Sequence, residues 1–493
     1  VGSEMCIRDS LVAAPPSSIG KFGGDTDNWI WPRHTGDFSM FRVYASKDNR
    51  PAAYSPQNVP YRPKKHFSIS TKGVKEGDFT MIYGFPGNTQ EYILSDAVAY
   101  IAERSDPAKI AIRTGRLDII TKAQESDPAL RIHYAAKHAS IANAWKKWQG
   151  EALGIDRRGT VAAKFDYETQ FGLWSVGRPE YAGVVMGLRA EYDRIMDAYF
   201  AYEITRETLS TLPAAYTPEE RAEECFARRK FAEQALWRHA FREYGRCPKV
   251  YRTPSYAEGM ARYKSPEAYA DALFEAVWEG SDSVAMQPAV RLREETKRML
   301  DHISWMLGTK SLRNLNSKIL NELYTTYIKG LREWDRERAF YPDANLTLRV
   351  AYGSVAGYEY ADGEYHKPQT TLDGIIAKDN PEIYDYDIPQ SLRDLYASKN
   401  YGRWGTVIDG RRTVPVCFLA TNHTTGGNSG SPVLNAGGEL IGINFDRTWR
   451  STMSDIAFDP AICRNIAVDI RYVLFVVDRV GGAGYLLKEM TLK

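Results

Sequence analysis

The stretch TTGGNSGSPVLN, residues Thr424 to Asn435, decides the fold of this chain. It places Ser429 in a glycine-flanked turn, where little side-chain bulk hinders a substrate carbonyl and backbone N–H groups can point at one spot. We predict that Ser429 is a nucleophile and that the N–H groups of Gly427 and Ser429 form an oxyanion hole. The alternative is a β-hairpin turn rich in glycine and serine, without a catalytic role.

Short β-prone runs surround this turn and predict an all-β unit. Before it lie FSMFRVYA and DFTMIYGFPG, which indicate strands over 39–43 and 78–85. After residue 341 come LTLRVAYGSVAGY, PVCFLAT, SPVLN, ELIGINF and YVLFVV, and the turn NAGGE joins two of these runs. Antiparallel strands joined by tight turns indicate a barrel or a sandwich. We expect residues 370–389 to form a long surface loop.

A helical region separates the two β-prone parts. From about Tyr92 to about Phe340 the chain is rich in Ala, Glu, Arg, Lys and Leu, with few turn signals. Seven apolar residues at steps of three or four predict one apolar stripe on a long helix: Leu312, Leu315, Ile319, Leu323, Tyr327, Leu331 and Trp334. The simplest architecture is a β unit, residues 11–91 and 341–493, interrupted by an α-helical domain over 92–340.

Bulk properties exclude several classes of protein. At 493 residues the chain is long enough for two or more domains. A net charge of +2 gives no argument for binding nucleic acid or a lipid surface. No run of 18 apolar residues exists, so the sequence predicts no transmembrane helix. The cysteines show no CxxC pair and no metal spacing, which favours buried free thiols at Cys225, Cys247, Cys417 and Cys463.

The first ten residues, VGSEMCIRDS, differ in character from the rest of the chain. They lack the apolar core of a signal peptide and resemble translated adaptor sequence, so we exclude residues 1–10 from the fold prediction. We expect the reading frame to begin in the middle of a protein.

A second chemical signal lies in GKFGGDTDNWIWPRHTGDFSMFRVY, residues 20–44. Two Trp, two Arg, a His and several Asp are dense for a segment that only connects two strands. Asp37 directly precedes a predicted strand, where a carboxylate could orient a catalytic imidazole. The alternative is that Asp37 caps a turn.

Together these strings resemble one family, the bacterial chymotrypsin-fold dipeptidyl-peptidases 7 and 11, which carry an inserted helical domain. IANAWKKWQG around Asn143, FDRTWRSTMSDI and CRNIAVDIRYVLFVVD add to the resemblance, which covers Leu11 to Lys493. It implies a chymotrypsin-like double β-barrel, with the first barrel incomplete, interrupted by the helical domain. It also implies a serine exopeptidase that releases dipeptides without a cofactor or metal, a homodimer, and a periplasmic, cell-surface or secreted location.

The resemblance assigns roles to individual residues. It implies that Ser429 is the nucleophile and Asp37 the triad aspartate. It further implies that the α-amino group of the substrate is held by Asn28, Trp29, Asn143 and Asp446. A carboxylate with two amide oxygens can satisfy the three donors of an ammonium group. Without the resemblance, Asn28 and Asn143 would be taken for loop or helix caps.

The triad histidine is the departure from the family pattern. In this fold the triad runs His, Asp, Ser along the chain, so the resemblance implies a histidine that would lie before residue 1. His34 lies in the block of residues 20–44 and His423 directly precedes Thr424, so each lies on the same loop as Asp37 or Ser429, which does not match the triad geometry. We therefore expect the chain by itself to lack its general base and to be inactive.

Arg447 directly follows Asp446, and the resemblance implies that an arginine here selects an acidic residue at the second substrate position. A guanidinium can bind a carboxylate bidentately, and a guanidinium left unpaired would penalise neutral side chains. Three alternatives remain for this position and this chain: a surface arginine, a peptidase of the same family that selects apolar residues, and a non-catalytic peptide-binding relative.

Overall fold

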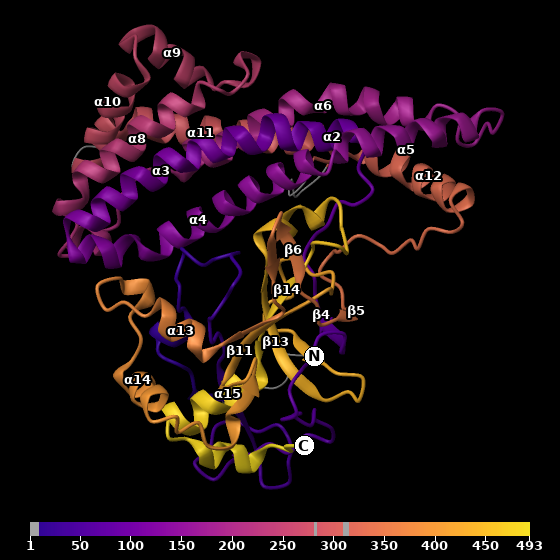
Figure 1. Ribbon diagram of the computed structural model, residues 1–493. Coiled ribbons are helices and arrows are strands. Elements are labelled where there is room, and N and C mark those ends of the chain that lie inside the picture. The colour runs from indigo at the N-terminus through magenta and orange to yellow at the C-terminus, as the bar shows by residue number, and fades with distance from the viewer. Residues whose placement is uncertain (1–8, 281–282, 309–314) are drawn as a thin grey trace. The chain divides into compact units, whose positions relative to one another are not determined.

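The computed structural model describes residues 9–280, 283–308 and 315–493. The chain forms two compact units, each described by itself. The first unit consists of the residues up to Glu91 together with Asp343–Lys493, and the second unit is Tyr92–Pro342. The first unit contains the sheets and the second is helical (Figure 1).

Two sheets carry the residues of interest in the first unit. A three-stranded sheet has the order β1-β2-β3, and a seven-stranded sheet has the order β5-β4-β12-β13-β14-β11-β8. The strands are β1 (Asp9–Ala13), β2 (Met40–Ala45), β3 (Val59–Pro60), β4 (Phe79–Gly84), β5 (Arg349–Ser354), β8 (Gln369–Thr371), β11 (Pro415–Ala420), β12 (Pro432–Leu434), β13 (Leu440–Arg447) and β14 (Asn465–Asp469). The smaller pairs are β6 (Tyr358–Ala361) with β7 (Glu364–His366), and β9 (Thr406–Ile408) with β10 (Arg411–Thr413).

The larger sheet closes on itself. An antiparallel bridge joins Val355 to Ala420, and the N–H of Thr421 donates to the Ser354 carbonyl at 2.9 Å. These bonds connect the end of β5 to β11, so that β11, β14, β13, β12, β4 and β5 form a ring. Strands β4 and β5 pair antiparallel from Phe79–Ser354 to Gly84–Arg349, although the whole helical unit separates them in sequence.

The core of the first unit lies inside this ring and under the helices beside it. All six residues of β11 and all five of β14 are buried. Both faces of these strands are therefore covered, which explains why PVCFLA reads as a continuous apolar run without alternation. Helix α15 (Ile470–Phe475) packs against β11, β13 and β14. Burial of each large side chain here contributes roughly 1.5 to 3 kcal/mol.

Two predictions for the first unit are wrong. Residues 370–389 form the end of β8, the helix α13 (Leu372–Lys378) and a 3₁₀ turn over Tyr384–Tyr386, and not a long loop. The reason is that Leu372 and Ile375, three residues apart, are both buried in the core. The run YVLFVV is helical and not a strand, because Asp469 caps α15 by accepting a bond from the Arg471 N–H at 2.9 Å.

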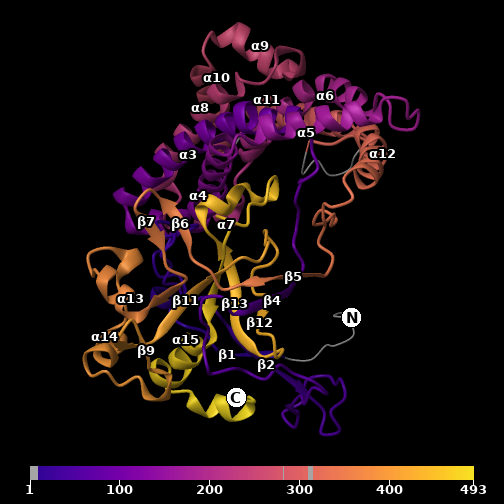
Figure 2. The same cartoon turned by 45° about the vertical axis from the view of Figure 1, so that its right-hand side comes forward.

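The second unit consists of helices, of which α3 and α4 lie side by side in both views (Figures 1 and 2). The helices are α2 (Ser95–Ala99), α3 (Asp106–Ser126), α4 (Pro128–Arg157), α5 (Thr160–Ser175), α6 (Val184–Glu207), α7 (Pro218–Ala222), α8 (Lys230–Tyr244), α9 (Pro254–Tyr263), α10 (Pro266–Glu279), α11 (Ser283–Met306) and α12 (Lys318–Trp334). Several begin with a capping side chain followed by proline, as at Asp127, Thr253 and Ser265.

The predicted long helix is shorter than its apolar stripe. Helix α12 begins at Lys318, because the Ser317 side chain caps it by accepting a bond from the Leu320 N–H. Leu315 is buried but precedes the helix, and Leu312 lies outside the described residues. Ile319 is 47% exposed, so it does not belong to the buried face that Leu320, Tyr327 and Leu331 form.

The N-terminal boundary also differs from the prediction. Asp9 and Ser10, which the sequence analysis excluded, are the first residues of β1 and pair with Val43 and Arg42. Residues 1–8 lie outside the described part of the chain.

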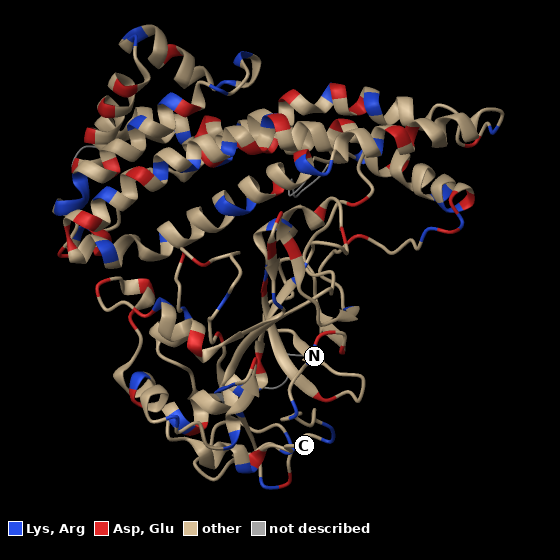
Figure 3. Cartoon of the chain, viewed as in Figure 1, with Lys and Arg blue, Asp and Glu red and all other residues tan. Residues whose placement is uncertain are grey.

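Cys225, Cys247, Cys417 and Cys463 are free and buried, as predicted. Among the described helices, none combines the length and the hydropathy needed to cross a bilayer. Charged residues of both signs alternate along the helices of the second unit (Figure 3).

Candidate active site

Ser429 lies on a loop that precedes β12 and is fixed at both ends by β13. The Asn428 N–H donates to the Thr425 carbonyl and the Asn428 side chain accepts from the Thr425 N–H, both at 3.0 Å. From β13, Asn444 accepts from the Gly430 N–H at 2.8 Å and donates its side-chain amide to the Asn428 carbonyl at 3.2 Å. These bonds hold the exposed Ser429 on a rigid support.

Gly427 and Ser429 are both exposed. The Ser429 Oγ lies 3.2 Å from the Phe445 carbonyl, which is its hydrogen-bond partner among the described residues. Within that part of the chain, neither the Gly427 N–H nor the Ser429 N–H has an acceptor. Gly427 has φ +105°, and a Cβ at this position would overlap the Phe85 carbonyl oxygen. Only glycine fits there, so the turn that presents these two donors requires it.

Asp37 lies in a chain of charges that includes Arg33 and Asp446. Desolvation by the surrounding protein raises the pKa of the Asp37 carboxyl, the Arg33 charge lowers it, and the Asp446 charge raises it. The Arg33 Nη1 donates to Asp446 Oδ2 at 2.9 Å, and both side chains are nearly buried. Arg33 therefore balances the charge of two carboxylates that would otherwise repel each other.

Trp29 and Asp446 are brought together, although 417 positions separate them. The Trp29 N–H lies 3.3 Å from Asp446 Oδ2, and the Arg447 N–H donates to Asp446 Oδ1 at 2.8 Å. Trp29 has φ 65°, a left-handed conformation that a non-glycine residue adopts at a cost. Asn28 precedes it on the same loop. Asn143 lies on α4 of the second unit, and its part in substrate binding rests on the resemblance alone.

Arg447 is not the unpaired guanidinium that the sequence analysis considered. Its Nη1 and Nη2 donate to the two oxygens of Asp455 at 2.6 and 2.8 Å, and its Nη1 also donates to Ser454 Oγ at 2.8 Å. Its side chain is only 5% exposed, so the reading of a surface arginine is wrong as well. The penalty that an isolated buried charge would impose on neutral substrates is therefore smaller than the sequence suggested.

Neither histidine of the two motifs bonds to Ser429. The His423 Nε2–H donates to the Ser454 carbonyl at 2.9 Å, and its Nδ1 lies 3.3 Å from Glu91 Oε1. His34 is buried, and this burial, with the charges of Lys378 and Arg33, lowers its pKa to about 3. An imidazole with that pKa is a poor general base at neutral pH.

The buried His34 predicts a pH-dependent stability. Its pKa is about 3 in the folded chain and 6.5 for an imidazole exposed to water, so the unfolded state binds more protons between these values. The contribution of the neutral His34 to the free energy of unfolding is complete above pH 6.5. It is lost as the pH falls, by about 1.4 kcal/mol per pH unit. The free energy of unfolding is measured with urea at pH 5 and at pH 7. We expect the decrease from pH 7 to pH 5 to be about 2 kcal/mol smaller in His34→Gln than in the parent chain. Equal differences would show that His34 is not held neutral by the fold.

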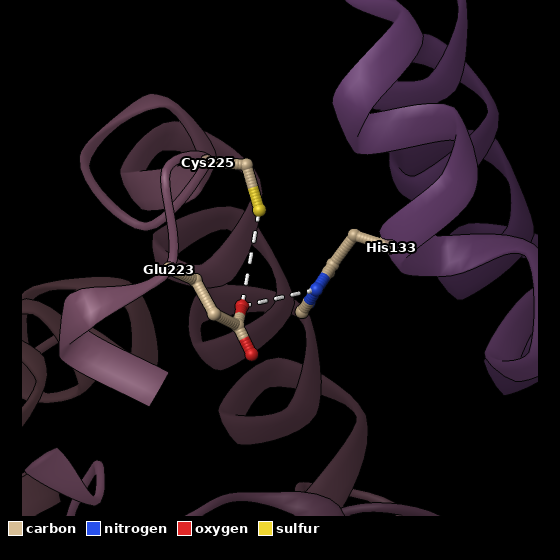
Figure 4. Close-up of side chains that lie close together, drawn as sticks. All are labelled: His133, Glu223 and Cys225. Carbon is tan, nitrogen blue, oxygen red and sulfur yellow. Dashed lines mark hydrogen bonds and ion pairs between the residues drawn. The ribbon is translucent and has the colours of Figure 1, made fainter. Parts of the chain in front are cut away.

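One group of metal-ligating side chains occurs among the described residues, in the second unit (Figure 4). Glu223 Oε2 lies 3.4 Å from His133 Nδ1 and 3.8 Å from Cys225 Sγ. However, the buried Arg229 places Nη1 3.2 Å from the same Glu223 oxygen and 2.5 Å from His133 Nε2. The Arg229 guanidinium already neutralises the Glu223 carboxylate and contacts two of the three side chains that could bind a metal. We therefore assign no metal to this cluster.

Three residues of the site were not predicted from the sequence: Arg33, Asn444 and Asp455. Arg33 and Asp455 lie within the quoted strings, but nothing in a string shows which acidic residue an arginine pairs with. Asn444 reads as one polar position in an apolar strand. Its side chain accepts from the Asn465 amide at 2.9 Å, so the only available signal was a buried polar residue that needs partners.

An exposed serine hydroxyl in a glycine-flanked turn, beside two backbone N–H groups without an acceptor among the described residues, is typical of a serine peptidase, and this is the class of the chain. Comparison with known proteins makes the class specific. The family model Peptidase S46 matches residues 7–224 and 216–492. The chain belongs to this family, whose relatives here are serine-type dipeptidyl-peptidases.

Individual relatives agree with this assignment. The chain is 42% identical to the Asp/Glu-specific dipeptidyl-peptidase of Capnocytophaga gingivalis, over 98% of this chain and 73% of that protein. It is 35% identical to dipeptidyl-peptidase 7 of Phocaeicola vulgatus, over 98% of this chain and 72% of that protein. The crystal structure of Porphyromonas endodontalis DPP11 with the dipeptide Arg-Glu matches with a TM-score of 0.82 and 34% identity, over 98% of this chain and 74% of that one.

Proposed function

We propose that this chain carries the nucleophile and the specificity pocket of a peptidase that releases dipeptides with Asp or Glu as their second residue. One observation carries the proposal: the buried Arg447 follows Asp446 on β13, and the carbonyl of the preceding Phe445 bonds to the Ser429 hydroxyl. The proposed amine ligand and selective cation are thus neighbours on β13, and the proposed nucleophile is bonded to the same strand. The Asp/Glu-specific relative from Capnocytophaga gingivalis supports the same specificity.

The proposed chemistry follows from this arrangement. Ser429 Oγ attacks the carbonyl after the second substrate residue, and the Gly427 and Ser429 N–H groups bind the oxygen that becomes negative. Asp37 orients the imidazole that takes the serine proton, and we propose that this imidazole comes from outside the described residues. The closed ring of six strands supports one chymotrypsin-like barrel, and β1 to β3 would belong to the other.

Asp446 is proposed to bind the substrate ammonium group. A carboxylate offers about four acceptor positions. Among the described residues, Arg33 and Trp29 use two on Oδ2 and the Arg447 N–H uses one on Oδ1, which would leave one position on Oδ1 for the ammonium group. Because this contact fixes the first residue of the substrate, cleavage falls two residues from its end.

The amine contact is tested in an extended enzyme, which we define as this chain joined to an N-terminal segment of the family that supplies the histidine. Asp446→Ala should lower kcat/KM for peptides with a free amino group about a hundredfold, since a charge-assisted contact is lost. Peptides with an acetylated amino group should be poor substrates of both enzymes. Asp379→Ala, which removes the partner of Arg393 elsewhere in the first unit, is the control. Equal cleavage of free and acetylated peptides would contradict the proposal.

Two alternatives differ in what they predict. A peptidase selective for apolar residues would prefer Leu over Glu at the second position, but the buried Arg447 disfavours it. A non-catalytic peptide-binding protein would bind peptides without turnover in the extended enzyme.

A homodimer at the periplasm or cell surface is a further proposal, supported by the resemblance and the bacterial origin of the relatives.

A further inference from the structure

Arg447 and Asp455 form a buried, bidentate ion pair next to the proposed amine ligand. The side chains of Arg447 and Asp455 are 5% and 14% exposed. Asp455 binds the Nη1–Nη2 edge of the guanidinium, with one oxygen on each nitrogen. The positive charge that would recognise an acidic substrate is thus already balanced by a carboxylate of the chain itself.

The partner carboxylate is held firmly by its own surroundings. Asp455 ends the 3₁₀ helix Trp449–Asp455, and its carbonyl accepts from the Gln90 N–H at 2.6 Å. The preceding Ser454 binds Arg447 through its Oγ and His423 through its carbonyl. Asp455 therefore stays beside the guanidinium while a substrate binds, because leaving it would break several buried hydrogen bonds.

A second carboxylate on this guanidinium has a defined place. A guanidinium binds carboxylates bidentately on two edges, Nη1–Nη2 and Nε–Nη2. Since Asp455 occupies the first edge, an acidic substrate side chain would bind on the second. Two carboxylates would then share one cation and repel each other, whereas a neutral side chain would meet a pair whose charges already cancel.

We propose that Asp455 is a specificity-determining residue, which limits the preference of the pocket for an acidic second residue by acting as the counter-ion of Arg447. This inference rests on the proposed function, which places Arg447 in the pocket. A purely structural role would be different: Asp455 would hold Arg447 in position, and its loss would weaken the acidic preference. The two roles therefore predict opposite changes in the acidic preference when Asp455 is replaced.

The experiment compares the dipeptides Arg-Glu and Arg-Gln, which have nearly the same shape and differ in charge. Their Kd values are measured by titration calorimetry on the chain itself, in the parent and in Asp455→Asn. We expect the ratio of the Arg-Gln Kd to the Arg-Glu Kd to rise about tenfold in the variant, because the repulsion between carboxylates is removed and the cation is no longer neutralised. An unchanged or lower ratio would overturn the proposal.

Two further variants make the result unambiguous. Asp469→Asn removes the charge of another buried partner, that of Arg471, and should lower stability without changing the ratio. Arg447→Met should abolish the preference for Arg-Glu, and adding Asp455→Asn in its background should remove the repulsion of Arg-Glu without creating a preference for it. If Arg447→Met keeps the preference, the proposed function fails. If it loses the preference while Asp455→Asn alone does not raise it, only this inference fails. Should the chain bind neither dipeptide, the same ratio is taken from kcat/KM of the extended enzyme on matching substrates.

Discussion

Replacing Ser429 by alanine should abolish turnover in the extended enzyme and leave its fold intact. The hydroxyl is exposed and bonds only to the Phe445 carbonyl among the described residues, so its loss removes little packing. Loss of a triad serine lowers kcat by on the order of 10⁴- to 10⁶-fold. The measurement is the initial rate of release of a chromogenic amine from a Glu-containing dipeptide substrate, with the thermal midpoint as a check of folding.

Two controls define this result. Ser431→Ala changes a nearby hydroxyl that lies beyond the turn and should keep most of the rate. The chain without its extension should show no more turnover than the Ser429→Ala enzyme, because no imidazole bonds to Ser429 in the part of the chain that the structure describes. Substantial turnover by Ser429→Ala would refute its assignment as nucleophile. Turnover by the unextended chain that is lost in Ser429→Ala would instead indicate a base within it.

Arg447→Gly should reverse the substrate preference of the extended enzyme. The substitution removes the cation and leaves the Asp455 carboxylate without its counter-ion in the proposed pocket, so an acidic substrate side chain meets repulsion where it met attraction. Truncating one partner of a buried charge pair costs roughly 2 to 5 kcal/mol, which corresponds to a decrease of about thirtyfold to several thousandfold in kcat/KM. The kcat/KM for substrates with Leu at the second position should increase.

The matched control for this substitution is the double variant Arg447→Gly with Asp455→Asn. Removing both charges together should recover much of the stability that Arg447→Gly loses, because no buried charge is left alone. Its preference should be for neutral residues, without the added repulsion of acidic ones. If Arg447→Gly retains its preference for Asp and Glu, the acidic pocket is built from other residues.

Local patterns predicted the elements that follow one simple periodicity. Strands β2 and β4 and the hairpin of β12 and β13 lie where β-prone runs and turn residues indicate them. The run YVLFVV failed because a short, fully buried apolar segment has no periodicity that separates a strand from a helix. The cap that decides it, Asp469, lies outside the run.

The site shows a different limit. The local strings suggested Ser429 and Asp37, and the family resemblance implied the roles of Asp446 and Arg447. Their partners were not predictable in the same way. Arg33 pairs with Asp446 across 413 positions, and pairing across such a distance depends on the tertiary fold. Arg447 lies only eight positions from Asp455, yet several acidic residues are equally near in sequence, so spacing alone did not identify the pair.

The most direct test of the account is the mass of the acyl-enzyme. The extended enzyme is mixed with a peptide that carries a free amino group and Glu at the second position, quenched in acid within milliseconds, and digested for mass spectrometry. The account predicts an added dipeptidyl group on the peptide that contains Ser429, with Glu as the acylating residue, and no such group in Ser429→Ala. An adduct on another residue, or one of a length other than two residues, would contradict it.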